Sequence, residues 1–174
     1  MKRTVLFVVA AAAMGLSGCV STPAPTSMAM MTSTAQFVPT ATASNTFEIE
    51  SSRIALRKSR DPEVRRFANQ MIRDHSRAAR QMVASARSAG IAAPPAALDS
   101  RHQTMVDQLA AAPAGQFDAL YVQMQQQAHQ EAVALFTAYS QGGDNPTMVA
   151  FAQETLPTLQ MHYEHIQAIT QQAQ

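Results

Sequence analysis

The sequence contains little cysteine and little glycine, and each scarcity excludes a class of structure. Cys19 is the only cysteine among 174 residues, so no disulfide can form within the chain. No segment from residue 34 onward alternates apolar and polar residues as a strand does, and the glycines of this region fall between apolar helical repeats. No apolar run after residue 18 approaches the ~20 residues that a membrane-spanning helix needs. These absences favour an all-α domain without a membrane-spanning helix.

The single cysteine ends a pattern that is typical of exported proteins. Lys2 and Arg3 precede an apolar run that ends at Leu16, and small residues follow it. The sequence Leu16-Ser17-Gly18-Cys19 resembles the bacterial lipoprotein box, in which the thiol receives a diacylglyceryl group and begins the mature chain. We therefore expect a signal peptide at residues 1–18 and lipidation of Cys19. The alternative is an ordinary signal peptide with an incidental cysteine.

The residues around the expected cleavage site also predict a location. Val20, in place of aspartate, is typical of lipoproteins that proceed to the outer membrane of a two-membrane cell. Residues 19–33 carry no charge and two prolines, as a flexible tether does. We expect the lipid to be the membrane contact and the domain to lie at the periplasmic face of the outer membrane. Removal of residues 1–18 would leave 11 basic and 12 acidic residues, a net charge near −1.

Residues 34–172 are enough for one domain with a hydrophobic core. Apolar residues recur there at three- and four-residue spacing, which indicates helices. Capping and breaking residues place the helices at about 34–59, 62–89, 100–111, 116–140 and 146–171. Four long helices, with a short extra helix in the long connection between the second and third, predict an antiparallel four-helix bundle.

Several ordered motifs of this region resemble one family. They are Phe47-Glu48-Ile49, the run from Arg66 to Ser76, Gly115-Gln116-Phe117-Asp118 with Tyr121 and His129, and Thr155-Leu156-Pro157 with His162. Together they resemble the domain of unknown function 4142 over roughly residues 33–170. The resemblance implies a ferritin-like four-helix fold in bacterial envelope proteins, often labelled predicted outer-membrane proteins, and it implies no established activity.

Polar residues on the apolar helix faces are the candidate site. Glu48, His75 and His129 lie on three different helices. If the turns near residues 60 and 142 share one end of the bundle, a rise of 1.5 Å per residue puts these three within roughly 5 Å of one level. The same count puts His162 roughly 10 Å deeper. We therefore expect Glu48, His75 and His129 to converge, with His162 displaced from them.

Two interpretations of this cluster remain open. In the first, Glu48 accepts a hydrogen bond from a histidine within a buried network, since buried polar groups require partners. In the second, Glu48, His75, His129 and His162 bind Zn²⁺ or another divalent transition metal. Ferritin-like di-iron sites use Glu-x-x-His, but Ile72 and Leu159 occupy the glutamate positions before His75 and His162. Oxygen-activating di-iron chemistry is therefore not expected.

Other polar residues carry less information about a site. Asp74 is expected at the helix surface, paired with Arg73 or Arg77. His102 and His165 have no matching partners in the pattern. The order Ser-His-Asp, a phosphate-binding glycine loop and a Cys–His pair are all absent from the sequence. We therefore expect a non-catalytic binding or structural module; the alternative is a metal-binding protein or metal-dependent enzyme.

The lysines and arginines of the mature chain are confined to residues up to Arg101. Arg66, Arg73, Arg80 and Arg87 repeat every seven residues on one helix face, and no lysine or arginine follows Arg101. The arginines either form a solvated face, or contact anionic envelope polymers or lipids, or pair with the acidic half of a second copy. Nucleic acid is a poor partner for an exported lipoprotein.

Overall fold

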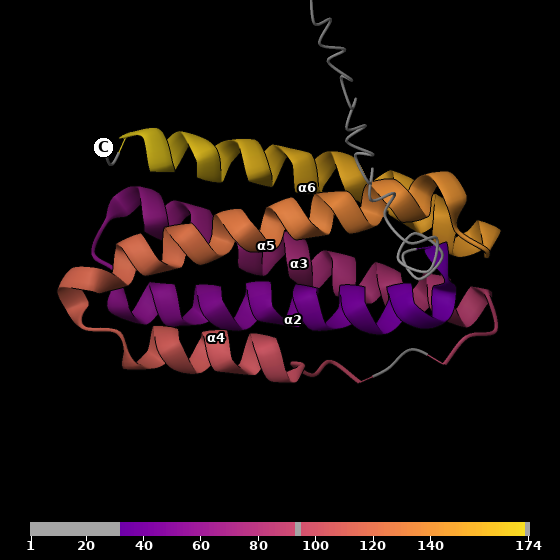
Figure 1. Cartoon of the computed structure of the whole chain (residues 1–174), viewed down its shortest axis with the longest axis horizontal. Coiled ribbons are helices and arrows are strands. Elements are labelled where there is room, and N and C mark those ends of the chain that lie inside the picture. Colours follow the sequence, from indigo (N-terminus) through magenta and orange to yellow (C-terminus); the bar gives the residue numbers. More distant parts are fainter. Residues whose placement is uncertain (1–31, 93–94, 173–174) are drawn as a thin grey trace, which may run out of the picture.

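The computed structural model describes residues 32–92 and 95–172, and these residues are helical apart from short connections (Figure 1). The helices are α2 (Thr34–Lys58), α3 (Pro62–Ser88), α4 (Ser100–Ala111), α5 (Ala114–Gly142) and α6 (Pro146–Gln172). The all-α prediction is confirmed, and each predicted helix end lies close to the observed one. The expected signal peptide, Cys19 and most of the tether lie outside the described residues.

Local sequence accounts for the helix ends. The Asp61 carboxylate accepts hydrogen bonds from the backbone N–H groups of Glu63 and Val64, and Pro62 occupies the first turn of α3. Asn145 caps α6 in the same way. Gly90 follows α3 with a φ of 71°, a conformation that glycine adopts without strain. Gly143 follows α5, where a Cβ atom would lie 2.7 Å from the carbonyl oxygen of Tyr139.

The long helices form an antiparallel bundle in which the chain crosses over once. α2 and α3 form one hairpin, α5 and α6 form the other, and α4 runs back along the outside of the bundle between them (Figure 1). Each long helix is antiparallel to its two packed neighbours, while α3 and α5 run parallel across the diagonal. This arrangement has the single long crossover of ferritin-like folds. The ferritin-like antiparallel bundle with a short extra helix is confirmed.

One topological assumption is wrong. The α2–α3 turn and the α5–α6 turn lie at opposite ends of the bundle, not at the same end (Figure 1). The reason is the connection that contains α4, which returns the chain to the end where α3 began. α5 therefore starts beside the start of α3. A position along the bundle axis that is counted from residue 142 must then be measured from the opposite end of the bundle.

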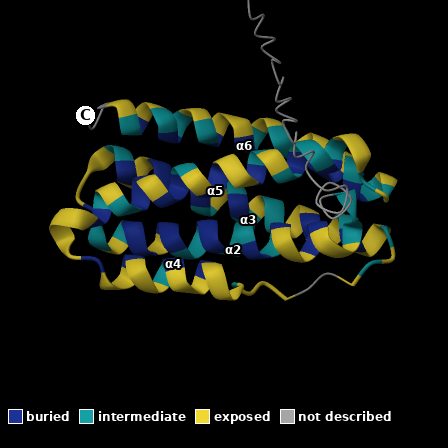
Figure 2. Ribbon diagram, viewed as in Figure 1, coloured by how far each residue is buried: buried dark blue, intermediate teal, exposed yellow. Residues whose placement is uncertain are grey.

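The hydrophobic core is divided into two clusters. One contains Phe47, Phe67 and Tyr121, and it lies toward the α2–α3 turn. The other contains Phe37, Phe136 and Phe151, and it lies toward the α5–α6 turn. Buried residues line the inward faces of the long helices, while the outer face of α4 is exposed (Figure 2). Between the two clusters lies a layer of buried polar side chains.

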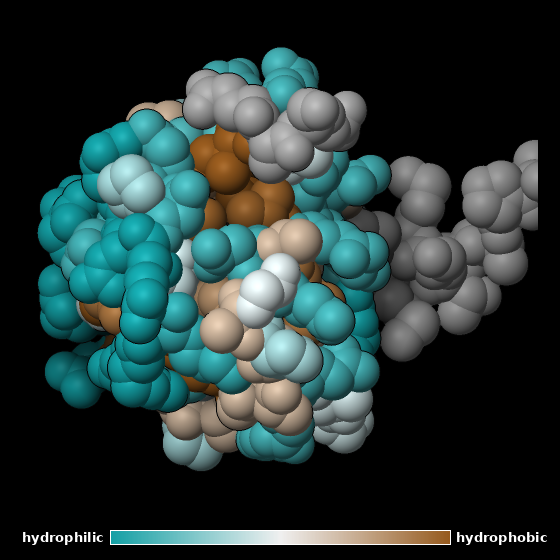
Figure 3. Space-filling view, turned by 90° about the vertical axis from the view of Figure 1, so that its left-hand side faces the viewer, coloured by the Kyte–Doolittle hydropathy of each residue, from teal (hydrophilic) through white to brown (hydrophobic). Residues whose placement is uncertain are grey.

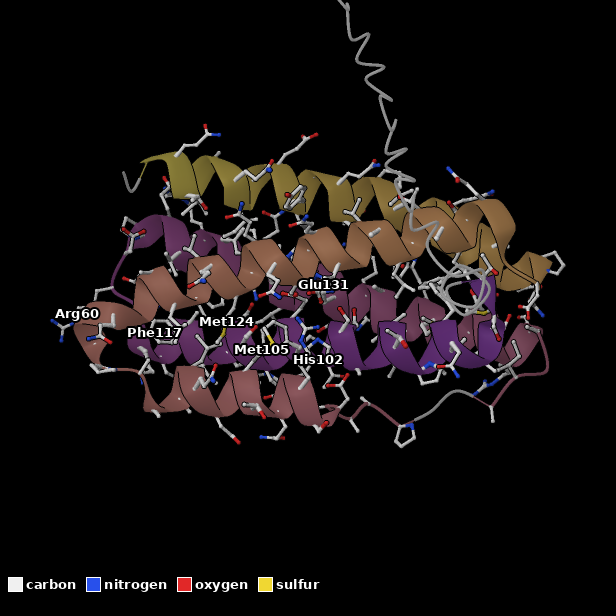
Figure 4. The ribbon with its side chains drawn as sticks, in the orientation of Figure 1. Arg60, His102, Met105, Phe117, Met124 and Glu131 are labelled. Carbon is white, nitrogen blue, oxygen red and sulfur yellow. The ribbon has the colours of Figure 1, made fainter. Side chains whose placement is uncertain are left out.

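α4 is attached to the bundle by a cation at each end. Near its start, Arg101 forms a two-bonded ion pair with Glu131 of α5. Near its end, the Lys58 ammonium donates to the carbonyl oxygens of Leu109, Ala110 and Ala112, which are the orphan acceptors of a helix C-terminus. Met105 of α4 and Met124 of α5 fill the interface between these attachments (Figure 4).

The start of α2 is fastened to the α5–α6 turn. The backbone N–H of Thr34 donates to the Asp144 carboxylate at 2.9 Å, and the N–H of Asp144 donates to the carbonyl of Thr32 at 3.1 Å. The hydroxyl groups of Thr34 and Tyr139 are also hydrogen bonded to each other. We call this set of contacts the Thr34 latch.

None of the helices within residues 32–92 and 95–172 combines the length and the apolar character required to cross a bilayer.

Replacement of Lys58 by Met should loosen α4. The change leaves three carbonyl groups without their charged donor, so we expect the free energy of unfolding to fall by about 1–3 kcal/mol in urea titration. Arg57→Met is the matched control, because Arg57 is the exposed neighbour of Lys58 in the same helical turn. Equal losses in both variants would contradict the capping role of Lys58.

Candidate metal centre

Each long helix contributes one ionisable side chain to the polar layer. Glu48 comes from α2, His75 from α3, His129 from α5 and His162 from α6, and all four are buried. The ring centroids of the three histidines lie 5.4–5.7 Å apart. One ligand atom from each ring lies within 4.8 Å of those from the other two. We call these three residues the histidine cluster.

The position of His162 corrects the depth estimated from sequence. His162 belongs to the histidine cluster and is not displaced from it, because α6 runs toward the end where α3 and α5 begin. His75 and His129 each lie near the middle of their helices, α3 and α5, which start at that end. His162 lies in the second half of α6, which finishes there, so the three rings come to one level.

One nitrogen of each ring is held as a hydrogen-bond donor. The Nδ1–H group of His75 donates to Asn45 Oδ1 at 3.0 Å, and the Nε2–H group of His162 donates to Asp74 Oδ2 at 3.0 Å. The Nδ1–H group of His129 donates to the backbone carbonyl of Gln125 at 2.9 Å. These acceptors fix both the orientation and the tautomer of each ring, as partners of metal-bound histidines do.

The other nitrogen of each ring has no partner. Within the described part of the chain, Nε2 of His75, Nε2 of His129 and Nδ1 of His162 are buried and make no hydrogen bond. Because the opposite nitrogen carries the proton, each of these atoms presents a lone pair. Leaving a buried polar atom unsatisfied costs about 1–3 kcal/mol, so three in one place require an explanation. One explanation is a single positive ion that accepts the lone pairs of all three ring nitrogens.

Burial keeps the rings neutral. It lowers the pKa of His75 well below the ordinary value of 6.5, and positive charge on His129 or His162 would lower it further. It lowers the pKa of His129 to about 3. It also lowers the pKa of His162, against the opposing effect of Asp74. Neutral imidazole is the form that binds a metal ion, so the cluster is in its ligating form at neutral pH.

Glu48 lies beside the histidine cluster but is not hydrogen bonded to it. Its Oε1 atom is 3.8 Å from Nδ1 of His129, which is too long for a hydrogen bond, and that nitrogen is already engaged by Gln125. The expectation that Glu48 accepts from a histidine is therefore wrong. Burial raises the pKa of Glu48 to about 8, although a hydrogen bond from the Gln125 side chain opposes the shift. Glu48 is thus neutral at pH 7, as are the rings.

Hydrogen-bonded polar groups continue the layer on the Glu48 side. Gln125 donates to the Ser51 hydroxyl at 3.0 Å, and the hydroxyl groups of Ser52 and Tyr121 lie 2.8 Å apart. Burial raises the pKa of Tyr121 far above its ordinary range. This side of the histidine cluster is therefore polar and buried, although Oε2 of Glu48 and Oε1 of Gln125 have no hydrogen-bond partner among the described residues.

Sequence reasoning missed the residues that orient the rings. Asp74 is not a surface partner of Arg73 or Arg77, because its carboxylate accepts from His162. Asp74 and His75 are neighbours in sequence and so lie about 100° apart around α3, which lets His75 face the bundle axis while Asp74 faces α6. Asn45 lies one turn before Glu48 on α2, and this spacing was the available signal. The role of Gln125 is carried by its backbone carbonyl, which no side-chain pattern reveals.

The remaining candidates lie outside the histidine cluster. His102 is paired with Asp99 at the start of α4, on the α2–α5 face (Figure 4). His165 contacts Gln70 at the α3–α6 interface. The four arginines of the heptad repeat are exposed on α3. Arg66 is paired with Glu63, and no carboxylate among the described residues pairs with Arg73, Arg80 or Arg87.

A hollow separate from the histidine cluster lies at the end of the bundle where α3 and α5 begin. Its floor contains Val64, Val122 and Ile169, and Asp61, Glu63 and Asp118 are acidic groups of its lining. Figure 3 shows a patch of apolar atoms with hydrophilic atoms beside it on this end of the molecule. It has no histidine, so it is distinct from the histidine cluster.

These features define a class: an all-helical bundle with a buried cluster of three ligand-ready histidines. The chain belongs to the family described as a domain of unknown function, DUF4142, whose model matches residues 19–169. The family resemblance seen in the motifs is thereby confirmed. No curated protein matches the chain.

Solved structures with the same fold come from more distant proteins. A DUF305 fragment from Deinococcus radiodurans has 18% sequence identity and a TM-score of 0.66, with 77% of this chain and 92% of that chain covered. CopM in its Cu(II)-bound form has 20% identity and a TM-score of 0.68, with coverage of 82% and 98%. CopM in its Cu(I)-bound form has 22% identity and a TM-score of 0.63, with coverage of 78% and 94%. At these identities the likeness is one of fold.

The pKa of Glu48 predicts a pH dependence in the metal-free protein. Near pH 6.5 the unfolded histidines still bind protons that the folded rings do not, so the histidines add a slope of the opposite sign, which is the same in any variant that keeps them. The folded state keeps the Glu48 proton up to about pH 8, whereas the unfolded state has lost it above its ordinary pKa of 4.5. Relative to a protein that cannot titrate at position 48, stability should therefore fall as pH rises from 6.5 to 8, by up to about 2 kcal/mol.

Glu48→Gln tests this dependence, because the amide keeps the shape of the side chain and cannot titrate. In urea titrations with a chelator present, the wild type should lose stability relative to the variant as pH rises over this range, since the histidine contribution is common to both proteins. Parallel curves for the two proteins would contradict burial of a neutral Glu48. Both proteins should lose stability as pH falls below 6.5, because their unfolded histidines gain protons.

Proposed function

We propose that this domain binds one copper ion, as Cu(I), through Nε2 of His75, Nε2 of His129 and Nδ1 of His162. The observation that carries the proposal is the set of three buried, unpartnered ring nitrogens whose opposite nitrogens are held as donors. Imidazole nitrogen suits copper and zinc, and a hydrogen-bonded outer partner on every ring is typical of metal sites.

Charge favours a monovalent ion. The three rings are neutral, burial keeps Glu48 neutral, and Asp74 supplies one negative charge through His162. Burying an ion is costly unless its charge is compensated, so a centre with one nearby carboxylate suits a single positive charge better than two. Solved forms of CopM, a protein of the same fold, hold Cu(I), Cu(II) and Ag, which supports the choice of copper over the divalent zinc considered from sequence.

The spacing of the rings requires only a small adjustment on binding. Bonds of about 2.0–2.1 Å from a metal to imidazole set tetrahedral ligand nitrogens about 3.4 Å apart. One ligand atom of each ring lies within 4.8 Å of those of the other two, so the ligating nitrogens need to approach one another by up to about 1.4 Å. Side-chain rotation of that size leaves the helices in place.

Titration of residues 20–174 with Cu(I), in competition with a chromogenic chelator, tests the proposal. We expect one ion per chain and a rise in melting temperature, since ligand at 100 times its Kd adds about 2.7 kcal/mol of stability. His75→Ala, His129→Ala and His162→Ala should each weaken binding at least tenfold. His165→Ala is the matched control, because His165 lies one turn from His162 and contacts Gln70 instead.

The outcomes separate the alternatives. Absence of stoichiometric copper, or equal binding by the control and the three variants, would overturn the proposal. Stoichiometric Zn²⁺ that copper does not displace would restore the divalent site considered from sequence.

We further propose that the domain is held in the cell envelope by a lipid on Cys19. The support is the order of charge, apolar run and lipoprotein box from Met1 to Cys19. The full chain should partition into the detergent phase, with an intact mass that begins at a lipid-modified Cys19. Cys19→Ala should abolish both properties, whereas Ser21→Ala should preserve them. An unmodified mature N-terminus at another residue would contradict the anchor.

A further inference from the structure

A cavity of about 40 Å³ lies between the long helices beside His75, the one member of the histidine cluster that lines it. All four long helices contribute to its wall, which extends from His75 toward the α5–α6 turn. Ala41, Met82, Phe136, Phe151 and Leu159 make the wall almost entirely apolar. The polar groups around Glu48 lie on the other side of the cluster, so the two sides of the histidine cluster differ in chemistry.

Most polar groups in the cavity wall are already engaged. The hydroxyl groups of Thr42 and Thr155 donate to backbone carbonyls one turn earlier in their own helices. The side-chain oxygen of Asn45 accepts from His75. A buried water needs two to four polar partners, and an anion needs donors or positive charge. The wall therefore disfavours both and suits an uncharged, apolar molecule.

We propose that this cavity holds one small uncharged molecule, of the size of carbon monoxide or dioxygen, bound to the fourth position of the copper ion. The inference rests on the proposed copper centre. Three imidazoles leave a tetrahedral ion one open position. Glu48 is placed toward the protonated side of a ring, since its Oε1 atom lies 3.8 Å from Nδ1 of His129, the nitrogen that donates to Gln125.

The volume sets the size of the ligand. A cavity of about 40 Å³ exceeds the ~10–15 Å³ that one water-sized molecule needs, and it is far below the ~300 Å³ of a typical organic-ligand pocket. A diatomic molecule fits this range, and a substrate with several ring atoms does not. The proposed site therefore discriminates by size and by lack of charge.

Carbon monoxide is the probe for the Cu(I)-loaded protein. We expect one molecule per copper, detected as a single C–O stretching band in the infrared. Ala41→Val adds two methyl groups to the wall and should weaken carbon monoxide binding at least tenfold, with Cu(I) affinity changed less than twofold. Leu159→Ala enlarges the cavity and should admit ethyl isocyanide, which the wild type should exclude.

The possible results separate failure of the cavity proposal from failure of the copper proposal. If the wild type fails to bind Cu(I), the proposed function fails and takes the inference with it. If Cu(I) binds but carbon monoxide does not, the cavity proposal alone is overturned. It is also overturned if Ala41→Val binds carbon monoxide as the wild type does, or if Leu159→Ala still excludes the isocyanide. Since one variant fills the cavity and the other enlarges it, misfolding of either leaves the other as a test.

Discussion

The bundle is organised around a desolvation constraint at its centre. Three imidazole rings and a carboxyl group lie where water does not reach, so each must be neutral and each polar atom needs a partner. Asn45, Asp74 and the Gln125 carbonyl satisfy one nitrogen of every ring. The bonds to Asn45 and Asp74 join α3 to α2 and to α6, whereas the bond to Gln125 lies within α5. The other nitrogen of every ring is left buried without a partner, which is an arrangement that stability alone does not favour.

The same layer explains why the apolar core is in two parts. The cluster with Phe67 and Tyr121 fills the bundle on the Glu48 side, and the cluster with Phe37 and Phe136 fills the opposite end. Edge-on contacts from Phe67 to His129 and Tyr121 connect the first cluster to the polar layer. The second cluster leaves the cavity beside His75. An ion at the centre would thus have a hydrogen-bonded polar side and an apolar side.

Local signals in the sequence predicted the positions of the helices and identified the histidines as candidate site residues, but they did not predict how the rings are arranged. Asp61, Gly90 and Asn145 act within a few residues of their position, and they predicted helix ends correctly. The level of His162 depended on the direction of the second hairpin, which the long connection with α4 determines and no local pattern encodes. The pairing of Asp74 with His162 depends on how α3 and α6 rotate against each other, a property of the packed bundle. The rings were therefore predictable as candidates, but their geometry was not.

The Thr34 latch has a mechanical consequence. It holds the start of α2 against Asp144 in the α5–α6 turn, at the opposite end of the bundle from the C-terminal end of α6 (Figure 1). A force applied through residue 32 would load these hydrogen bonds first, along the axis of α2, before it loads the packing of the helix. Glu48 lies farther along α2 by about 21 Å of helix, or about four turns. Tension applied at residue 32 would therefore break the hydrogen bonds of the Thr34 latch, and then disturb the packing of the first turns of α2, before it moved the histidine cluster.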